Sequence, residues 1–195
     1  MPAFSLRLLG AAIALGLGTF PAGAEDDPDQ PRYPTTVFED GAKSASVSVG
    51  DVTAGVSIVR RPQIDPAEDI PLLTVMVGGR RVIEVPGVAS GFDFPAADAS
   101  IAEIDPGNGR PEVYFTSYSG GAHCCSTVIV ATETPRGWVA VPVGDFDGDG
   151  DYLDDLNGDG VAEIATVDNR FLYTFDCYAC SAAPLVIYGV RDGKL

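Results

Sequence analysis

The hydrophobic positions of this chain recur in short runs in which apolar residues alternate with small or polar ones. Alternation with a period of two places successive side chains on opposite faces of a strand, so it predicts half-buried β-strands. Gly and Pro, at 23 and 15 residues, are spread throughout the chain, and helical periodicity is almost absent. We therefore predict strands in the runs at 44–49, 54–59, 71–77, 81–85, 112–118, 126–132, 138–143, 163–167, 171–175 and 184–190.

Glycine-containing turn signals separate several of these runs. Gly78-Gly79, Arg136-Gly137 and Asp192-Gly193 each lie between two β-rich stretches or follow one. Tight hairpin turns require positive φ angles, which glycine adopts without steric cost. The chain is therefore predicted to be all-β with little helix, built of antiparallel hairpins that form propeller-blade-like or sandwich sheet modules.

The N-terminal segment predicts export. Arg7 precedes an apolar run that is too short to span a bilayer, and small residues ending in Ala24 follow. This is the pattern of a signal peptide over residues 1–24, and it indicates a periplasmic or secreted protein without membrane insertion. Polar, proline-rich residues 25–36 are expected to form a flexible lead-in, and residues 37–195 a single all-β domain.

The net charge narrows the class of partner. The chain has 28 acidic and 12 basic side chains, which gives a net charge of −16. Nucleic acid is a polyanion, so this charge argues against it as a partner and favours cations.

An internal repeat is faintly visible, at about 101–143 and 151–195. In each copy an acid-and-glycine loop is followed by a β run, a pair of cysteines, a second β run and a turn. Glu112 and Glu163 begin the corresponding β runs, about fifty residues apart. A period of this size suits a β-sheet module such as a propeller blade.

The most acidic stretch, 145–164, reads DFDGDGDYLDDLNGDGVAEI. In its second half, oxygen-bearing side chains occupy positions 1, 3, 5 and 9 counted from Asp155. Gly160 at position 6 allows the backbone to reverse, so that the next residue offers its carbonyl. Calcium takes six to eight oxygen ligands, which this spacing helps to supply. The predicted calcium ligands are Asp155, Asn157, Asp159, Val161 and Glu163.

This loop is not a complete EF-hand, because position 12 is Thr166 and the following IATV is a strand pattern. With its acid at position 9, it resembles the calcium loops of FG-GAP and VCBS-type repeats, which occur in integrin α-chain propellers and many exported bacterial proteins. The resemblance covers about twenty to fifty residues. It implies a loop set between strands, with the same five residues as ligands. The Phe-Gly/Gly-Ala-Pro signature of those repeats is absent here.

The first half of the stretch begins in the same way, but its position 9 is Leu153. It offers either a second calcium site or extra ligands for the first, and a solvated acidic turn is the alternative for both halves. The related loop at Asp105 has fewer acids, and we expect it to be an Asn-Gly turn that binds no metal. The candidate second-site residues are Asp145, Asp147, Asp149 and Asp151.

Four cysteines in an exported chain predict two disulfides. The repeat favours bonds between the segments Cys124-Cys125 and Cys177–Cys180; a vicinal bond and a bond within the second segment are the alternatives. A transition-metal site that uses His123, Cys124, Cys125, Cys177 and Cys180 is a second interpretation. Thiol redox or Cys/His catalysis is a third.

No nucleophile elbow, phosphate-binding loop or dinucleotide fingerprint is present, so no catalytic residue is assigned. We expect an exported, calcium-binding, disulfide-stapled β domain with a structural or ligand-binding role. A cell-envelope hydrolase and a metal-handling protein that uses the Cys/His cluster are the alternatives. Aromatic residues of the strands provide a candidate surface for a carbohydrate or protein partner, namely Tyr114, Phe115, Tyr118, Tyr173 and Tyr178.

Overall fold

A computed structural model describes residues 32–61, 68–92, 94 and 96–195. Its contacts divide the chain into residues 1–30 and 31–195, and the fold described below is that of the second unit. The predicted signal peptide and residues 25–31 of the predicted lead-in lie outside the described residues. Within the described part, no helix has the length and hydropathy needed to cross a bilayer.

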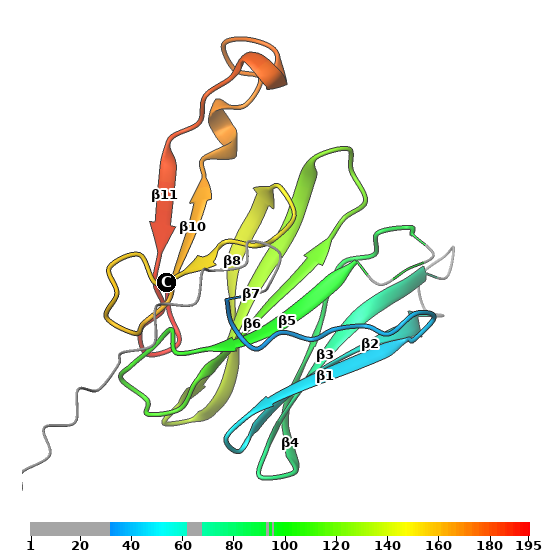
Figure 1. The fold of residues 1–195 in the computed structure, drawn as a ribbon, viewed down its shortest axis with the longest axis vertical. Coiled ribbons are helices and arrows are strands. Elements are labelled where there is room, and N and C mark those ends of the chain that lie inside the picture. Colours follow the sequence, from blue (N-terminus) through cyan, green and yellow to red (C-terminus); the bar gives the residue numbers. More distant parts are fainter. Residues whose placement is uncertain (1–31, 62–67, 93, 95) are drawn as a thin grey trace, which may run out of the picture. The chain divides into compact units, whose positions relative to one another are not determined.

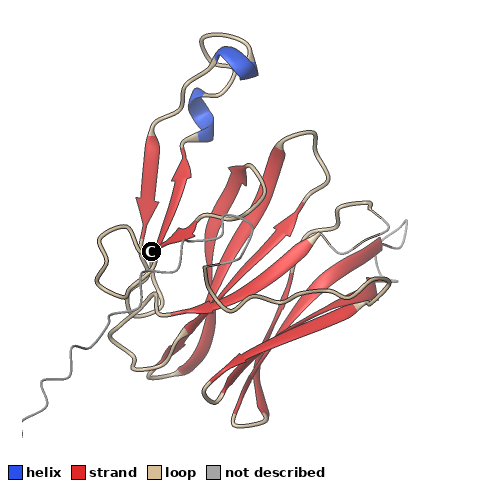
Figure 2. Cartoon of the chain, in the orientation of Figure 1, coloured by secondary structure: helices blue, strands red, loops and turns tan. Residues whose placement is uncertain are grey.

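The described residues form an all-β fold of three antiparallel sheets, as the alternating pattern predicts (Figures 1 and 2). The first sheet runs in the order β1-β2-β3-β4. A short turn joins β1 to β2, and Gly78 and Gly79, both with positive φ, make the predicted hairpin turn between β3 and β4. The strands are β1 (Ser44–Val49), β2 (Val52–Arg61), β3 (Glu68–Val77) and β4 (Arg80–Pro86).

The second sheet, in the order β5-β6-β7-β8, is covered on both faces. Val113 and Phe115 of β6 pack towards the first sheet, whereas Tyr114 between them packs towards the third. Two-sided burial explains why β6 has an almost continuous buried run, since both sets of alternating side chains meet a core. The strands are β5 (Ala97–Ala102), β6 (Glu112–Tyr118), β7 (Cys124–Thr134) and β8 (Gly137–Asp147).

The third sheet has the order β11-β10-β9 and is the smallest. Two short 3₁₀ turns lie in the connection between β10 and β11, at the far end of that hairpin in Figure 1. After β11, Asp192 and Gly193 have positive φ and form the predicted turn, closed by the Arg191–Lys194 pairing. The elements are β9 (Leu153–Asp154), β10 (Glu163–Val167), η1 (Asn169–Phe171), η2 (Tyr178–Cys180) and β11 (Leu185–Tyr188).

The structure corrects two of the sequence predictions. Residues 171–175 form no strand: Phe171 ends η1 and the residues after it form a turn, where Tyr173 has a φ of 61° and Phe175 is 81% exposed. Residues 33–36 are not a free lead-in, because Thr35 pairs with Ser100 of β5 and the Thr36 N–H donates to the Ala99 carbonyl at 2.9 Å.

The second and third sheets share an order of elements. The Asp105 loop joins β5 to β6, and the Asp155 loop joins β9 to β10. Cysteines follow in both: Cys124 and Cys125 begin β7, and Cys177 and Cys180 precede β11. In both sheets the strand after the loop is an inner strand, flanked by the strand before the loop and by the strand that begins at or after the cysteines.

Candidate functional site: an acidic loop and an aromatic pocket

The Asp155 loop is folded around the carboxylate of its first residue. Asp155 Oδ1 accepts the N–H groups of Gly158 and Asp159, at 2.8 and 3.1 Å, and its Oδ2 accepts that of Gly160 at 2.8 Å. The Gly160 N–H makes the largest contribution to lowering the pKa of Asp155 below its ordinary value, because it stabilises the charged form. The negative charge needed by a cation site is therefore retained well into acidic solution.

The remaining predicted ligands lie in the same loop. The Asn157 and Asp159 side chains accept the N–H groups two residues further on, at 2.8 and 2.9 Å, and so set the two local turns. Glu163, at the start of β10, accepts the Leu156 N–H at 3.1 Å. Asp155, Asn157, Asp159 and Val161 thus lie on one loop between two strands, and Glu163 begins the second strand. The carboxylates of Asp155, Asp159 and Glu163 do not all lie within 4.8 Å of one another.

The loop at Asp105 also precedes a strand that begins with a glutamate, but the surroundings of that glutamate differ. Glu112 is 0% exposed, and its carboxylate accepts four bonds, from the backbone N–H groups of Ile104 and Asp105 and the side chains of Asn108 and Thr132. The Asn108 amide donates to Glu112 at 2.6 Å. Internal donors thus satisfy the hydrogen-bonding capacity of this buried carboxylate.

The first half of the acidic stretch is not a loop at its start. Asp145 and Asp147 lie in β8, and both carboxylates have partners. Asp145 accepts the Thr127 hydroxyl at 2.6 Å, and Asp147 contacts His123 and Tyr178. The second calcium site of Asp145, Asp147, Asp149 and Asp151 stays a prediction.

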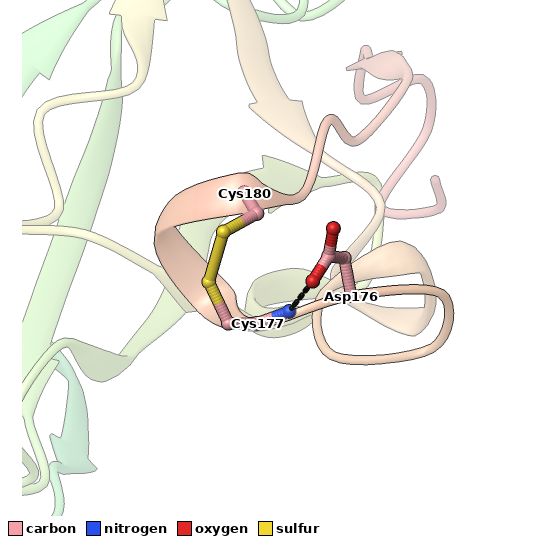
Figure 3. A group of neighbouring side chains, drawn as sticks. All are labelled: Asp176, Cys177 and Cys180. Carbon is pink, nitrogen blue, oxygen red and sulfur yellow. Dashed lines mark hydrogen bonds between the residues drawn. A yellow bond between two sulfur atoms is a disulfide. The ribbon is translucent and has the colours of Figure 1, made fainter.

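The four cysteines form two local disulfides, Cys124–Cys125 and Cys177–Cys180. Figure 3 shows the second of these, beside the Asp176 carboxylate, which accepts the Cys177 N–H at 2.7 Å. The expected bonds between the two segments are wrong. The segments do meet, but through rings, since Tyr178 stacks on His123 with centroids 3.9 Å apart.

The same bonds bear on the transition-metal interpretation. Among the described residues, only Asp176, Cys177 and Cys180 bring three acidic, thiol or imidazole ligand atoms within 4.8 Å of one another. Both sulfurs of that group are engaged in a disulfide. The cluster of His123, Cys124, Cys125, Cys177 and Cys180 therefore offers no thiolate in this oxidised state.

His123 is held at the centre of a polar cluster. Its Nδ1 lies 2.7 Å from Asp147 Oδ1, and its Nε2 lies 2.8 Å from the Tyr173 hydroxyl. The Tyr178 hydroxyl donates to the other oxygen of Asp147 at 2.6 Å, and this bond is the main cause that raises the pKa of Tyr178. The positive φ of Tyr173, uncommon for a bulky residue, places its hydroxyl within this cluster.

An aromatic pocket of about 480 Å³ opens beside the His123–Tyr178 stack. Phe92 stacks on Phe94 with centroids 5.0 Å apart, and Tyr118 extends the row at 6.3 Å from Phe92. The pocket is lined by Phe92, Phe94, Ala96, Ala97, Asp98, Thr116, Tyr118, Ala122, His123, Gly148, Asp149 and Tyr178.

The predicted aromatic surface is therefore only partly present. Tyr118 and Tyr178 line the pocket, and Tyr173 borders it through His123, but Tyr114 and Phe115 are buried in the two cores. The sequence prediction missed Phe92 and Phe94 and the link between His123 and Asp147. Strand pairing of Cys124 with Asp147 brings that link together, which a sequence separation of 24 residues does not reveal.

Comparison with known proteins yields two curated relatives. A cyanobacterial protein named "Probable thylakoid lumen protein sll0997", from Synechocystis sp., is 39% identical over 155 residues, which cover 78% of this chain and 45% of that protein. "Uncharacterized protein y4bJ" from Sinorhizobium fredii is 38% identical over 127 residues, which cover 64% of this chain and 20% of the relative.

The chain thus spans less than half the length of either relative. No protein-family profile matches the chain. No solved structure matches it either.

Proposed function

We propose that this chain is an exported β domain that binds calcium in the Asp155 loop and a ligand in the aromatic pocket. Export is supported by the signal-peptide pattern of residues 1–24, by two disulfides, and by similarity to a protein named for the thylakoid lumen. Disulfides persist in oxidising, exported compartments.

The observation that carries the calcium proposal is the contrast between the two loops. Both begin a strand with a glutamate, but Glu112 is buried with four donors, whereas Glu163 is half-buried and receives the Leu156 N–H and the Asn157 amide, the latter at 3.4 Å. Asp159 adds a further acid where the first loop has Asn108. The second loop therefore retains negative charge that its own donors do not balance.

Calcium would add the missing positive charge. Carboxylate oxygens that accept one N–H keep further lone pairs, so the loop's own hydrogen bonds do not exhaust its ligand capacity. Binding requires the side chains of Asp159 and Glu163 to turn towards Asp155 and the Val161 carbonyl. A loop between strands that is closed in this way resembles an FG-GAP or VCBS-type repeat, and we propose that the second and third sheets descend from one repeated module.

A thermal-unfolding comparison tests this proposal. At a free calcium concentration of roughly 100 times Kd, binding to the folded state stabilises it by about 2.7 kcal/mol, which raises the Tm of a domain of this size by about 5–10 °C. EGTA should reverse the shift. A Glu163→Gln variant should lose most of it, whereas Glu39→Gln, at an exposed acid outside the loop, should keep it. Equal melting curves in calcium and EGTA would refute the calcium site.

A further inference from the structure

The aromatic pocket has a composition that selects for one sign of charge. Asp98 and Asp149 are among its lining residues, and the described lining contains no Lys or Arg. Aromatic faces carry the negative part of the ring quadrupole, so they add to the attraction of these carboxylates for a cation. An anionic ligand would meet repulsion here.

Asp98 is the carboxylate that lacks a partner. It keeps contact with solvent, and within the described part of the chain no hydrogen bond or ion pair holds it. Although the side chain is exposed to solvent, desolvation by the surrounding protein raises its pKa, with a smaller contribution from Asp151. The carboxylate has no counter-ion among the described residues. A bound cation would supply that counter-ion.

The polar groups of His123 and Tyr178, which also line the pocket, already form hydrogen bonds within the protein. His123 uses both ring nitrogens, on Asp147 and Tyr173, and the Tyr178 hydroxyl donates to Asp147. The hydrogen-bond acceptors that the described lining of this pocket leaves free are carboxylate oxygens, those of Asp98 and Asp149, which suit a cation of any substitution. A quaternary ammonium group has no N–H to satisfy and is attracted by aromatic faces.

We propose that this pocket binds a small organic cation, for which choline is the probe. The pocket volume of about 480 Å³ suits a small organic ligand. Phe92, Phe94 and Tyr118 contact the methyl groups of choline, and Asp98 and Asp149 balance the charge. Choline itself is favoured over glycine betaine or phosphocholine, whose negative groups oppose the two carboxylates. The inference rests on the proposed ligand-binding role of the pocket, and it does not depend on calcium.

The test is a calorimetric titration of the full mature chain with choline chloride, at constant ionic strength, once in EGTA and once in calcium. We expect a dissociation constant in the millimolar range or below in both buffers. The neutral isostere 3,3-dimethyl-1-butanol should bind at least about 10-fold more weakly, because it has the same shape without the charge. Glycine betaine and phosphocholine should also bind more weakly than choline.

Paired variants locate the site. Phe94 is 62% exposed, so Phe94→Ala should leave the fold intact and weaken choline binding by about 3-fold or more. Asp98→Asn should weaken it similarly. Phe175→Ala, at an exposed ring outside the pocket, and Asp192→Asn, in the turn after β11, are the matched controls and should bind choline like the wild type.

The outcomes separate this inference from the wider proposal. Binding of glucose without binding of choline would overturn the ligand class but keep a ligand-binding pocket. Equal affinity for choline and its neutral isostere would overturn the charge-based argument. Binding of none of these probes would overturn both the ligand class and the ligand-binding role, whatever the result with calcium.

Discussion

Single carboxylates in this protein differ in how fully their charge is balanced. Glu103 stands close to Glu112 and Asp105, and its Oε1 is buried without a hydrogen-bond partner among the described residues. Burial is the largest cause that raises the pKa of Glu103, followed by these two neighbouring acids, while Arg191 opposes the shift. The ionised side chain therefore destabilises the folded state at neutral pH.

Replacing Glu103 with glutamine should stabilise the protein. A carboxyl whose pKa is raised in the folded state binds its proton more tightly there, so folding gains stability as the pH falls through that raised value. Glu103→Gln removes the unfavourable charge and should raise stability at pH 7 by up to about 1 kcal/mol. The gain should vanish below the ordinary pKa of 4.5, where both chains are neutral at this position. Urea unfolding at several pH values measures this difference, and a gain that persists at low pH would contradict the explanation.

Residue-level chemistry was only partly accessible from the sequence. The spacing of Asp155, Asn157, Asp159 and Glu163 marks one loop because all four lie within nine positions. The cluster of His123, Asp147, Tyr173 and Tyr178 depends instead on strand register and on the turn at Tyr173, so no local pattern reveals it. The same holds for Phe92 and Phe94, which lie outside any predicted strand.

At the scale of elements, alternation predicted most strands because successive side chains in most of them differ in burial. The predicted bounds of β1, β6 and β10 agree with the structure. The strand β5, with the sequence ADASIA, was missed because alanine and serine give little hydropathic contrast, and β9 has only two residues. The run at 171–175 was predicted as a strand from its aromatic content, yet its rings lie on an exposed turn.

Glu112 anchors the start of β6 to the loop that precedes it. Its Oε2 accepts the Ile104 and Asp105 N–H groups at 2.9 and 2.8 Å inside the protein. In Glu112→Gln the side-chain amide either turns its N–H₂ group towards these donors or offers them a weaker, neutral oxygen acceptor. We therefore expect the free energy of unfolding to fall by about 3 kcal/mol. Glu133→Gln breaks a partly exposed ion pair with Arg110 and should cost less than about 1 kcal/mol. Urea midpoints compare the two, and equal losses would contradict the assigned anchoring role.

At the scale of the whole molecule, the second sheet separates two cores. The aromatic pocket takes lining residues from its strands β5 and β6, whereas the Asp155 loop belongs to the third sheet. Tyr114 of β6 connects the core to the pocket, since its buried hydroxyl donates to the Gly150 carbonyl at 2.7 Å, and Gly150 follows Asp149 of the pocket lining. The all-β architecture followed from the sequence, but the stacking of sheets did not, because periodicity reports which face is buried and not what covers it. The expected bonds between the cysteine segments were wrong because the repeat gives the order of the cysteines along the chain and not which sulfurs lie together.

The central claim is that the Asp155 loop is a calcium site, and calorimetric titration of the mature chain with calcium tests it most directly. The account predicts saturable binding with one ion per chain in the wild type. Asp155→Asn should weaken this binding by at least about 10-fold, since a ligand charge is lost from the site. Asp145→Asn, at the strand residue that lies outside the loop, should leave it unchanged. Absence of binding in the wild type, or equal binding by Asp155→Asn, would contradict the account.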